Sequence, residues 1–404
     1  MADGVRLLKI GCLYGSNASG KTNILKALDF FARFMVKDSL NKGDETYVVP
    51  FLLDDVSAKE KTEFEMTFYQ NRERYKLNLV LNNKVIYSEV LQVYSSAQPT
   101  MLYKRSYNAE TDSTDIVFGG KIGLLKKSRE TILGNTINNR TVIAAFGLSN
   151  VEKSRLNLVY DFFLQGIAHL MYPQSDLMGF TKSRLKRDGD GRLKKFILHF
   201  LKASDFNISD ISVHEEDMAI TPTLEMMIKS TPGMSEVTKM EILKKGVITS
   251  EEMFFMHHTE YGEKELDESL ESRGTKRYMG LATILYDLLA HGVILPIDEI
   301  ETSIHYELLS YFIKVFLVNS KKGAQLIIST HDINLLDEDY IRRDVIWFTD
   351  KNDCGETKLI RLSSLGLHKT LSVYNAYKQE KLVDLPFLDS IYMDMEEYYG
   401  NEEE

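Results

Sequence analysis

A glycine-rich turn between an apolar segment and an amphipathic segment constrains the fold of this chain more than any other feature. Residues 5–14 are mostly apolar and predict a buried strand, and the apolar spacing over 23–36 predicts a helix. Glycines at both ends of such a turn let successive backbone N–H groups point inward at phosphate oxygens. The turn consists of Gly15, Ser16, Asn17, Ala18, Ser19, Gly20, Lys21, Thr22 and Asn23. This pattern predicts a phosphate-binding loop at a helix N-terminus.

The last residues of the turn indicate which phosphates are bound. Lys21 supplies a point charge to the β- and γ-phosphates of a nucleotide, and the Thr22 hydroxyl is placed to ligate Mg²⁺. By average residue usage, roughly one or two chains in a hundred of this length carry the pattern by chance. The strand before the turn and the helix after it favour a functional loop, with ATP and Mg²⁺ as the expected ligands.

Length and composition describe a globular protein with a substantial core. The chain has 404 residues, of which 44% are hydrophobic and 27% charged, enough for two or three compact units or one head with an insertion. We find no apolar run of membrane-spanning length and no export signal, and two cysteines are too few for a disulfide framework. We therefore expect a cytoplasmic protein with no membrane partner. The net charge of −10 argues against a protein coated by nucleic acid.

The periodicity of apolar residues changes along the chain. Alternation over 46–118 predicts an antiparallel meander of strands, helical periods dominate over 121–204 with the clearest helix at 156–171, and strands return at 208–213 and 253–257. We therefore expect an α/β head formed by 1–120 and 205–404, with 121–204 inserted as a helical lid. Within this head we expect a mostly parallel sheet around the phosphate loop and an antiparallel side sheet.

A cluster of basic residues lies in the predicted lid. Its members are Lys182, Arg184, Lys186, Arg187, Arg192, Lys194 and Lys195. Such runs usually form a solvated loop and helix face. The alternative is a contact to the phosphates of a nucleic acid, which is less favoured because no aromatic residues alternate with the charges.

A second anion-binding turn is predicted before a helix at 278–290. Ser272 and Gly274 belong to a small, hydroxyl-rich turn, and a helix N-terminus attracts anions. One chain has no need of two such ends for one triphosphate, so this turn suggests a γ-phosphate delivered from a neighbouring subunit. An ordinary helix N-cap explains the turn equally well.

Two later strands end in polar residues suited to nucleotide chemistry. An apolar segment ends in Asp298 and Glu299, where Asp298 would hold Mg²⁺ and Glu299 would polarise the attacking water as a general base. Pro296 is unusual for a central strand and suggests a bulge or a skewed strand end. The strand within 324–332 places His331 where it would contact the γ-phosphate, and the alternative for His331 is a structural core histidine. His257 and His258 lack a third metal ligand at suitable spacing, so a structural role is favoured.

These segments, taken in order, resemble the ATPase heads of the ABC superfamily, on the branch that includes SMC, RecF and the overcoming-lysogenization-defect nucleases. They are most similar to the bacterial AAA-fifteen family, which is frequent in phage-defence loci and includes the PARIS ATPase component. The resemblance is carried by 13–23, 271–275, 298–305 and 329–332, with 343–349 and 377–386 similar as well. The implied fold is a P-loop ABC-type ATPase head with an antiparallel side sheet and a helical insertion.

The resemblance also implies roles for individual residues. ATP would be sandwiched head to tail between two subunits, with Ser272 and Gly274 acting on the partner's nucleotide. His305 stands where transporter ATPases carry an aspartate in the loop after the metal-holding strand. Gln70 and Gln92 are the candidates for a metal-sensing glutamine, and no adenine-stacking residue is assigned.

The resulting functional hypothesis is an ATPase that assembles as a homo-oligomer and controls a separate effector such as a nuclease, in anti-phage defence. One alternative is an ATP-switched scaffold with negligible turnover, and another is a RecF-like DNA-repair ATPase that binds nucleic acid. The chain ends in an acidic tail after Lys381 with interleaved aromatic residues, among them Phe387, Tyr392 and Tyr398. Such a tail is usually a solvated end, and docking on a basic partner is the alternative.

Overall fold

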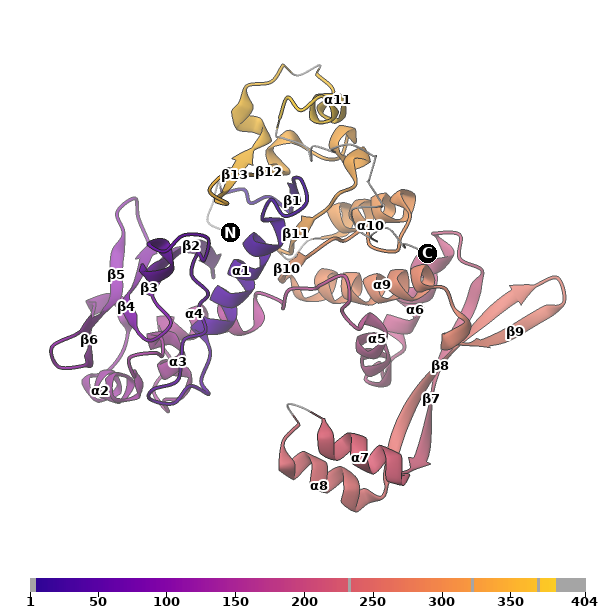
Figure 1. Cartoon of the computed structure of the whole chain (residues 1–404), viewed down its shortest axis with the longest axis horizontal. Helices are drawn as coiled ribbons and strands as arrows, with labels where there is room; N and C mark the ends of the chain where they lie inside the picture. Colours follow the sequence, from indigo (N-terminus) through magenta and orange to yellow (C-terminus); the bar gives the residue numbers. More distant parts are fainter. Residues whose placement is uncertain (1–4, 232–233, 321–322, 369–370, 383–404) are drawn as a thin grey trace, which may run out of the picture. The chain divides into compact units, whose positions relative to one another are not determined.

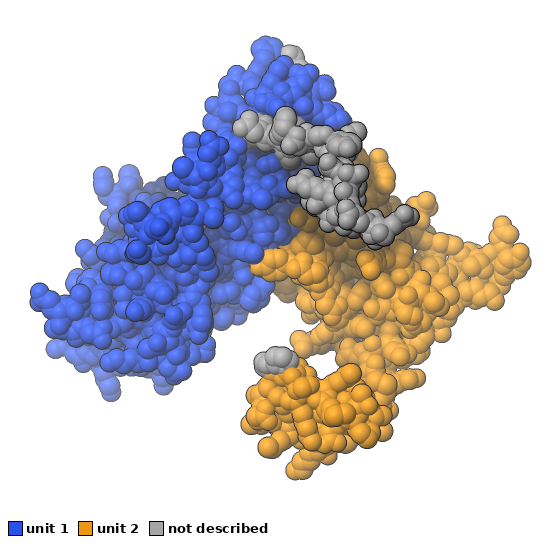
Figure 2. Space-filling view, viewed as in Figure 1, with its two compact units in different colours: residues 1–170, 296–298, 326–404 blue, residues 171–295, 299–325 orange. Residues whose placement is uncertain are grey.

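The computed structural model describes residues 5–231, 234–320, 323–368 and 371–382. These residues form two compact units (Figure 2). Unit 1 contains the described residues of 1–170, 296–298 and 326–404, and unit 2 contains those of 171–295 and 299–325. None of the helices in the described part of the chain has the length and apolarity needed to cross a membrane. The predicted docking tail after Lys381 lies, apart from Leu382, outside the described residues.

The strand before the glycine-rich turn lies at the centre of a five-stranded sheet, in the order β10-β11-β1-β12-β13 (Figure 1). β1 pairs in parallel with β11 and β12, and β12 pairs antiparallel with β13. The strands are β1 (Ile10–Tyr14), β10 (Ile294–Ile297), β11 (Gln325–Ser329), β12 (Ile346–Lys351) and β13 (Thr357–Arg361). Cys12 in β1 is fully buried, as expected of a strand covered on both faces. The predicted parallel arrangement around the phosphate loop is confirmed.

Pro296 lies in β10, which is the last strand at one side of this sheet. We expected a bulge or a skewed strand end, because proline removes a ladder N–H from a central strand. The order of the described strands places β10 at the edge of this sheet instead. An edge strand tolerates proline, because its outer side has no partner strand that needs an N–H donor.

The helix after the turn, α1 (Lys21–Met35), packs in unit 1 beside an antiparallel sheet. Its Phe31 ring stacks on Phe64 of that sheet with centroids 5.3 Å apart. The sheet has the sequential order expected of a meander, and every second residue of β3 from Tyr75 to Leu81 is buried. Its strands are β2 (Thr62–Gln70), β3 (Glu73–Leu81), β4 (Ile86–Tyr94), β5 (Thr100–Asn108) and β6 (Ser113–Phe118). The predicted side sheet is confirmed.

The segment 121–204 supplies helices to both units. Those in unit 1 are α2 (Lys126–Asn135), α3 (Val142–Gly147) and α4 (Arg155–Gln165), and those in unit 2 are α5 (Leu177–Lys186) and α6 (Arg192–Lys202). The helix predicted over 156–171 ends earlier, at Gln165, with Gly166 as its C-cap. These helices belong to two different compact units. The expected separate lid at 121–204 stays a prediction.

Unit 2 is built around α9 (Arg273–His291), which contacts α5, α6 and α10 (Tyr306–Asn319). The Tyr278 ring of α9 stacks on Phe200 of α6 with centroids 4.9 Å apart. A three-stranded antiparallel sheet contains β7 (Ile208–Ala219), β8 (Val247–Thr259) and β9 (Gly262–Asp267). Two short helices, α7 (Pro222–Ser230) and α8 (Glu236–Lys245), connect β7 to β8. The last described helix of the chain, α11 (Val373–Lys378), belongs to unit 1 instead. The predicted strands at 208–213 and 253–257 are parts of the longer β7 and β8.

A buried ionic network holds the side sheet of unit 1 to the chain that follows it. Glu89 on β4 and Arg105 on β5 are opposite each other in the sheet, and both are fully buried. Arg105 donates to Asn138 O at 2.8 Å, while Glu89 accepts from the Tyr103 hydroxyl at 2.6 Å and from Val142 N at 2.9 Å. Burial lowers the pKa of Arg105 to about 10, although the negative charge of Glu89 acts in the opposite direction and raises it. The same burial raises the pKa of Glu89.

We predict that Arg105→Ala lowers the free energy of unfolding by roughly 3–5 kcal/mol, because it leaves Glu89 as an uncompensated buried charge. The neighbouring Lys104 is exposed, so Lys104→Ala is the matched control. Urea unfolding of both variants measures the difference. A loss for Arg105→Ala no larger than that for Lys104→Ala would contradict the importance of this network.

Candidate functional site

The glycine-rich turn is fixed by hydroxyl groups from β12 and β13. Ser19 Oγ lies 2.6 Å from Thr349 Oγ1, and Thr357 Oγ1 donates to Ser19 O at 2.9 Å. Gly20 has a φ of 107°, and a Cβ at this position would overlap Thr357 Oγ1. Only glycine therefore combines this backbone conformation with this close approach. The sequence analysis gave no individual role to Thr349 or Thr357, which lie more than 300 residues away from the loop in the chain.

The N-terminus of α1 is available to an anion. Gly20 is the N-cap, no side chain caps the first turn, and that turn contains no acidic residue. Lys21 is 6% exposed, and its Nζ donates to Gly15 O at 2.9 Å and to Ser16 O at 3.0 Å. The first-turn N–H groups and the Lys21 ammonium thus bring positive charge to one loop. This arrangement fits a phosphate group.

Asp298 connects the end of β10 to the phosphate loop within unit 1. The Thr22 hydroxyl donates to Asp298 Oδ2 at 2.9 Å, and the Ser329 hydroxyl donates to Asp298 Oδ1 at 2.5 Å. Asp298 is only 4% exposed. A hydroxyl and a carboxylate oxygen at this separation are the hard oxygen ligands that Mg²⁺ prefers. The residues present therefore fit the predicted magnesium site. Ser329, to which the sequence analysis gave no individual role, is a further residue of this site.

The predicted catalytic residues Glu299 and His331 each lie two positions after the end of a strand, Glu299 after β10 and His331 after β11. Glu299 comes directly after Asp298 in the chain, belongs to unit 2, and has a φ of 45°, a conformation uncommon for a residue other than glycine. His331 is an exposed residue of unit 1, two positions after the end of β11. The neighbouring Asp332 is held to β1, because the Tyr14 hydroxyl donates to its backbone oxygen at 3.3 Å. Exposure of His331 argues against a core histidine.

The second predicted anion site lies at the start of α9 in unit 2. Ser272 is the N-cap of α9, and its Oγ accepts from Thr275 N at 3.0 Å. Gly274 is packed closely, since a Cβ at this position would lie 2.9 Å from Ser303 O. The ordinary capping role of Ser272 is thus present, and the phosphate-binding role of Ser272 and Gly274 stays a prediction. His305, which the resemblance also singled out, is the N-cap of α10.

A pocket of about 470 Å³ lies beside the first turn of α9, lined among others by Gln174, Arg273 and Lys276. Arg277 also lines it, is buried, and donates from Nη1 to Pro173 O at 3.2 Å. Burial lowers the pKa of Arg277, although the negative charge of Glu301 acts in the opposite direction and raises it. Gln174 was not considered from the sequence. The two glutamines that were, Gln70 and Gln92, lie on strands of the side sheet.

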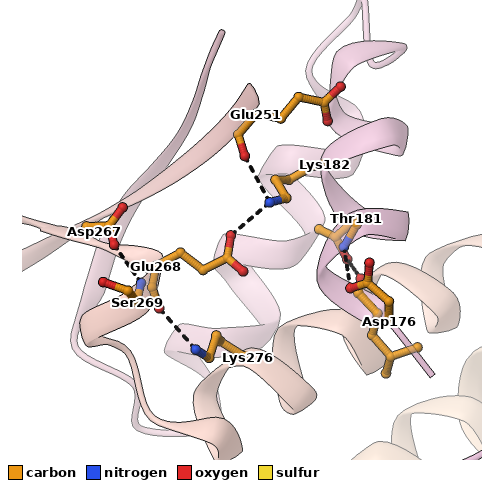
Figure 3. Close-up of polar contacts among 10 residues, drawn as sticks. Asp176, Thr181, Lys182, Glu251, Asp267, Glu268, Ser269 and Lys276 are labelled. Carbon is orange, nitrogen blue, oxygen red and sulfur yellow. Dashed lines mark hydrogen bonds and ion pairs between the residues drawn. The ribbon is translucent and has the colours of Figure 1, made fainter. Parts of the chain in front are cut away.

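Polar contacts attach α5, β8 and α9 to one turn of unit 2 (Figure 3). Lys182 Nζ donates to Glu251 O at 3.0 Å and pairs with Glu268 Oε2 at 3.1 Å, while Lys276 Nζ donates to Glu268 O at 3.1 Å. The residue before Ser272 is held as well, because Glu271 Oε1 lies 2.5 Å from His257 Nε2. These contacts position the segment that leads into α9.

The basic cluster of the predicted lid is largely neutralised by acidic neighbours. Lys182 pairs with Glu268, Arg184 with Asp287, Lys186 with Glu215 and Glu251, Arg192 with Asp190, and Lys194 with Asp210. Nucleic-acid binding by phosphate contacts needs cations that are free to replace counterions. The ion pairs favour the interpretation of a solvated, structural surface.

His257 and His258 each pair with a carboxylate. His258 Nδ1 lies 3.0 Å from Glu263 Oε1, and His257 Nε2 lies 2.5 Å from Glu271 Oε1. Within the described ranges, no group of three or more histidine, cysteine, aspartate or glutamate side chains is arranged to hold a metal ion.

An apolar groove beside the phosphate loop was not predicted from the sequence. It has a volume of about 820 Å³ and is lined by the first part of α1, the segment 47–53, Phe64, Lys351 and 355–357. Asn23 and Thr357 take part both in this lining and in the surroundings of the loop. Tyr47 and Leu52 are exposed here, and Lys37 Nζ lies 4.2 Å from the centre of the Tyr47 ring. Apolar clefts with a few polar groups are typical of sites for small molecules.

Comparison with known proteins identifies a matching family. The model of the family described as "AAA domain, putative AbiEii toxin, Type IV TA system" matches residues 10–337. Among solved structures, the "SMC head domain from Thermotoga maritima" is similar, with 13% identity, a TM-score of 0.39, and coverage of 87% of this chain and 90% of that chain. The "SmcHead bound to the C-winged helix domain of ScpA" is also similar, with 13% identity, a TM-score of 0.36, and coverage of 91% and 92%. No curated protein matches the chain.

We predict that Lys21→Ala abolishes binding of a nucleoside triphosphate, because it removes the buried cation of the phosphate loop. Lys42→Ala is the control, since Lys42 is exposed in the turn after α1. Titration with a fluorescent ATP analogue in the presence of Mg²⁺ measures both dissociation constants. Unchanged affinity in the Lys21 variant would show that the phosphates bind elsewhere.

Proposed function

The chain belongs to the AAA-domain family whose model spans residues 10–337, and from this membership we propose that it binds and hydrolyses ATP, assembles head to tail and controls a separate effector. The family match confirms the expected AAA-type ATPase head. The more specific resemblance to the AAA-fifteen family stays a prediction. The observation that carries the proposal is the hydrogen bond from Thr22 to Asp298, which connects the end of β10, the strand proposed to hold the metal, to the phosphate loop.

Binding of ATP is supported by the geometry of unit 1. The backbone N–H groups of 15–20 and the Lys21 ammonium would hold the phosphates, and Thr22 and Asp298 would hold Mg²⁺. Bound there, Mg²⁺ would neutralise charge on the β- and γ-phosphates. Ser329 keeps the Asp298 carboxylate in place by donating a hydrogen bond to its second oxygen.

Hydrolysis requires an activated water and groups that stabilise the departing phosphate. We assign Glu299 as the general base and His331 as a contact to the γ-phosphate, because both follow strands of the sheet that carries the phosphate loop. Ser272 and Gly274 of another subunit would contact the same γ-phosphate from the N-terminus of α9. The nucleotide would then join two subunits head to tail.

The base and ribose of ATP are assigned to the apolar groove of unit 1. The groove includes Asn23, one residue after Thr22, and is lined by the exposed Tyr47 ring. An aromatic face stacks on a nucleobase without a sequence-specific hydrogen bond. This assignment supplies the base contact for which the sequence offered no candidate.

The effector is proposed to be a separate protein such as a nuclease, and the setting to be anti-phage defence. The proposal rests on the family resemblance and on the sequence, in which we identify no nucleophile elbow and no nuclease-type metal cluster. The RecF-like alternative needs DNA contacts by the basic cluster, whose ion pairs argue against it.

We predict that Glu299→Gln lowers the steady-state rate of ATP hydrolysis by at least about 100-fold while ATP still binds, because water activation is lost and the phosphate contacts stay. Glu307→Gln, at an exposed position of α10, is the control. Phosphate release and nucleotide binding are measured on the same preparations. A Glu299→Gln protein that turns over ATP at the wild-type rate would refute the catalytic assignment, and a wild-type rate near zero with and without DNA or a partner protein would favour the scaffold.

We predict that Tyr47→Ala weakens ATP binding roughly 5- to 100-fold, the effect of losing one aromatic stack on a base. Tyr261→Ala is the control, because Tyr261 is an exposed tyrosine of unit 2. Both dissociation constants are measured for ATP and for inorganic triphosphate, which has no base. Equal weakening for both ligands, or for neither, would place the base outside the groove.

A further inference from the structure

Two threonines of the hairpin formed by β12 and β13 contact the same residue of the phosphate loop. β12 pairs in parallel with β1 up to Tyr14 and Phe348, so Thr349 lies next to the point where the loop begins (Figure 1). Thr349 Oγ1 lies 2.6 Å from Ser19 Oγ, and Thr357 Oγ1 donates to Ser19 O at 2.9 Å. The hairpin thus holds both the side chain and the main chain of Ser19.

The direction of the hydrogen bond between Ser19 and Thr349 follows from a count of hydrogens. A hydroxyl group has one hydrogen to donate and two lone pairs that accept. The Thr349 hydroxyl donates to Tyr14 O at 3.1 Å, since a carbonyl oxygen only accepts. In its contact with Ser19 Oγ, Thr349 Oγ1 is therefore the acceptor. The one hydrogen of the Ser19 hydroxyl is thus directed at Thr349, and it is not available to a bound phosphate at the same time.

Burial makes this pair of hydroxyls a fixed part of the loop. Ser19 and Thr349 are each 1% exposed, so neither hydroxyl has access to water as a substitute partner. A Cβ on Gly15 would overlap Thr349 Oγ1, which shows how closely the loop packs on β12. A buried hydroxyl that loses its partner keeps the full cost of its desolvation. Removal of either hydroxyl therefore disturbs the loop itself.

The contact from Thr357 fixes the orientation of the peptide group between Ser19 and Gly20. In a trans peptide the carbonyl oxygen and the N–H point in opposite directions. Because Ser19 O accepts from Thr357, the N–H of Gly20 points away from β13. Gly20 has a φ of 107°, which glycine adopts without strain. The hairpin therefore orients a donor directly before the first turn of α1.

We propose that Thr349 and Thr357 are positioning residues for phosphate binding, and that the Ser19 hydroxyl braces the loop internally rather than contacting phosphate. This inference rests on the proposed binding of nucleotide by the loop. The backbone N–H groups and Lys21 supply the contacts to phosphate, and the hairpin keeps the loop in the geometry that they need. A loop that is ordered before its ligand arrives loses less entropy on binding.

The experiment is calorimetric titration of the full chain with inorganic triphosphate and Mg²⁺, because triphosphate has no base to occupy the groove. Thr349→Val removes the hydroxyl at nearly constant volume, and we expect its dissociation constant to rise at least about fivefold, the effect of one lost hydrogen bond. Thr349→Ser keeps the hydroxyl and should restore most of this affinity. Ser19→Ala and Thr357→Val should each weaken binding as well. The double variant Ser19→Ala/Thr349→Val should bind no more weakly than the weaker single variant, because both changes break the same contact.

Thr136→Val is the matched control for a lost hydroxyl. Thr136 also belongs to unit 1, is 5% exposed, and donates from Oγ1 to Ile132 O at 2.7 Å at the end of α2. The change removes the same group from the interior and should leave the affinity for triphosphate at the wild-type value. Urea unfolding of every variant separates a loss of stability from a loss of binding.

Wild-type affinity in either Thr349→Val or Thr357→Val would overturn the proposal. It would also be overturned if Ser19→Ala bound weakly while Thr349→Val, which frees the Ser19 hydrogen, bound more tightly, since Ser19 would then be a phosphate ligand. An equal loss of affinity in Thr136→Val would reduce the effect to stability and would overturn it too. A wild-type chain that binds no triphosphate would instead contradict the proposed nucleotide binding, and this inference would fall with it.

Discussion

The structure around the candidate site depends on one buried carboxylate. Asp298 accepts hydrogen bonds from Thr22 at the start of α1 and from Ser329 at the end of β11, so three segments far apart in the sequence meet at its two oxygens. A buried carboxylate is tolerable only when such donors, or a cation, satisfy it. The same property makes the position suitable for Mg²⁺, because replacing a hydroxyl donor by a metal ion leaves the charge better compensated. The fold and the proposed Mg²⁺ site therefore both require the buried carboxylate of Asp298 beside Thr22 and Ser329.

The local parts of the site were predictable from the sequence, and the long-range parts were not. The phosphate loop and α1 followed from glycines, Lys21 and apolar spacing within some 30 residues, and the side sheet followed from strict alternation. Thr349 and Thr357 contact the phosphate loop across more than 300 residues of chain, and Ser329 contacts Asp298 across 31 residues. A lone hydroxyl residue in a strand carries no signal of such a contact. The part of β7 beyond Val213 was missed because its residues are exposed on both faces, so its sequence has no alternation to detect.

The two units carry different parts of the proposed function. Unit 1 contains the phosphate loop, Asp298, His331 and the apolar groove, which together account for binding of a nucleotide. Unit 2 contains Glu299, the first turn of α9 and the paired strands β7 and β8. Contacts of Lys182 with Glu268 and of His257 with Glu271 hold α5 and β8 to the turn before α9. Under the proposal, hydrolysis needs unit 1 and Glu299 of one subunit and α9 of another. This explains why one chain carries two helix N-termini suited to phosphate.

Mixing of two inactive variants tests this central claim most directly. Lys21→Ala removes the phosphate loop's cation, and Ser272→Asp keeps an N-cap on α9 while placing a carboxylate where the γ-phosphate of the other subunit would lie. Each chain alone should hydrolyse no ATP. The account predicts that the mixture regains activity, because a mixed pair contains one intact phosphate loop facing one intact α9 turn. A mixture as inactive as its components, or a Ser272→Asp chain that is fully active alone, would contradict a site shared between subunits.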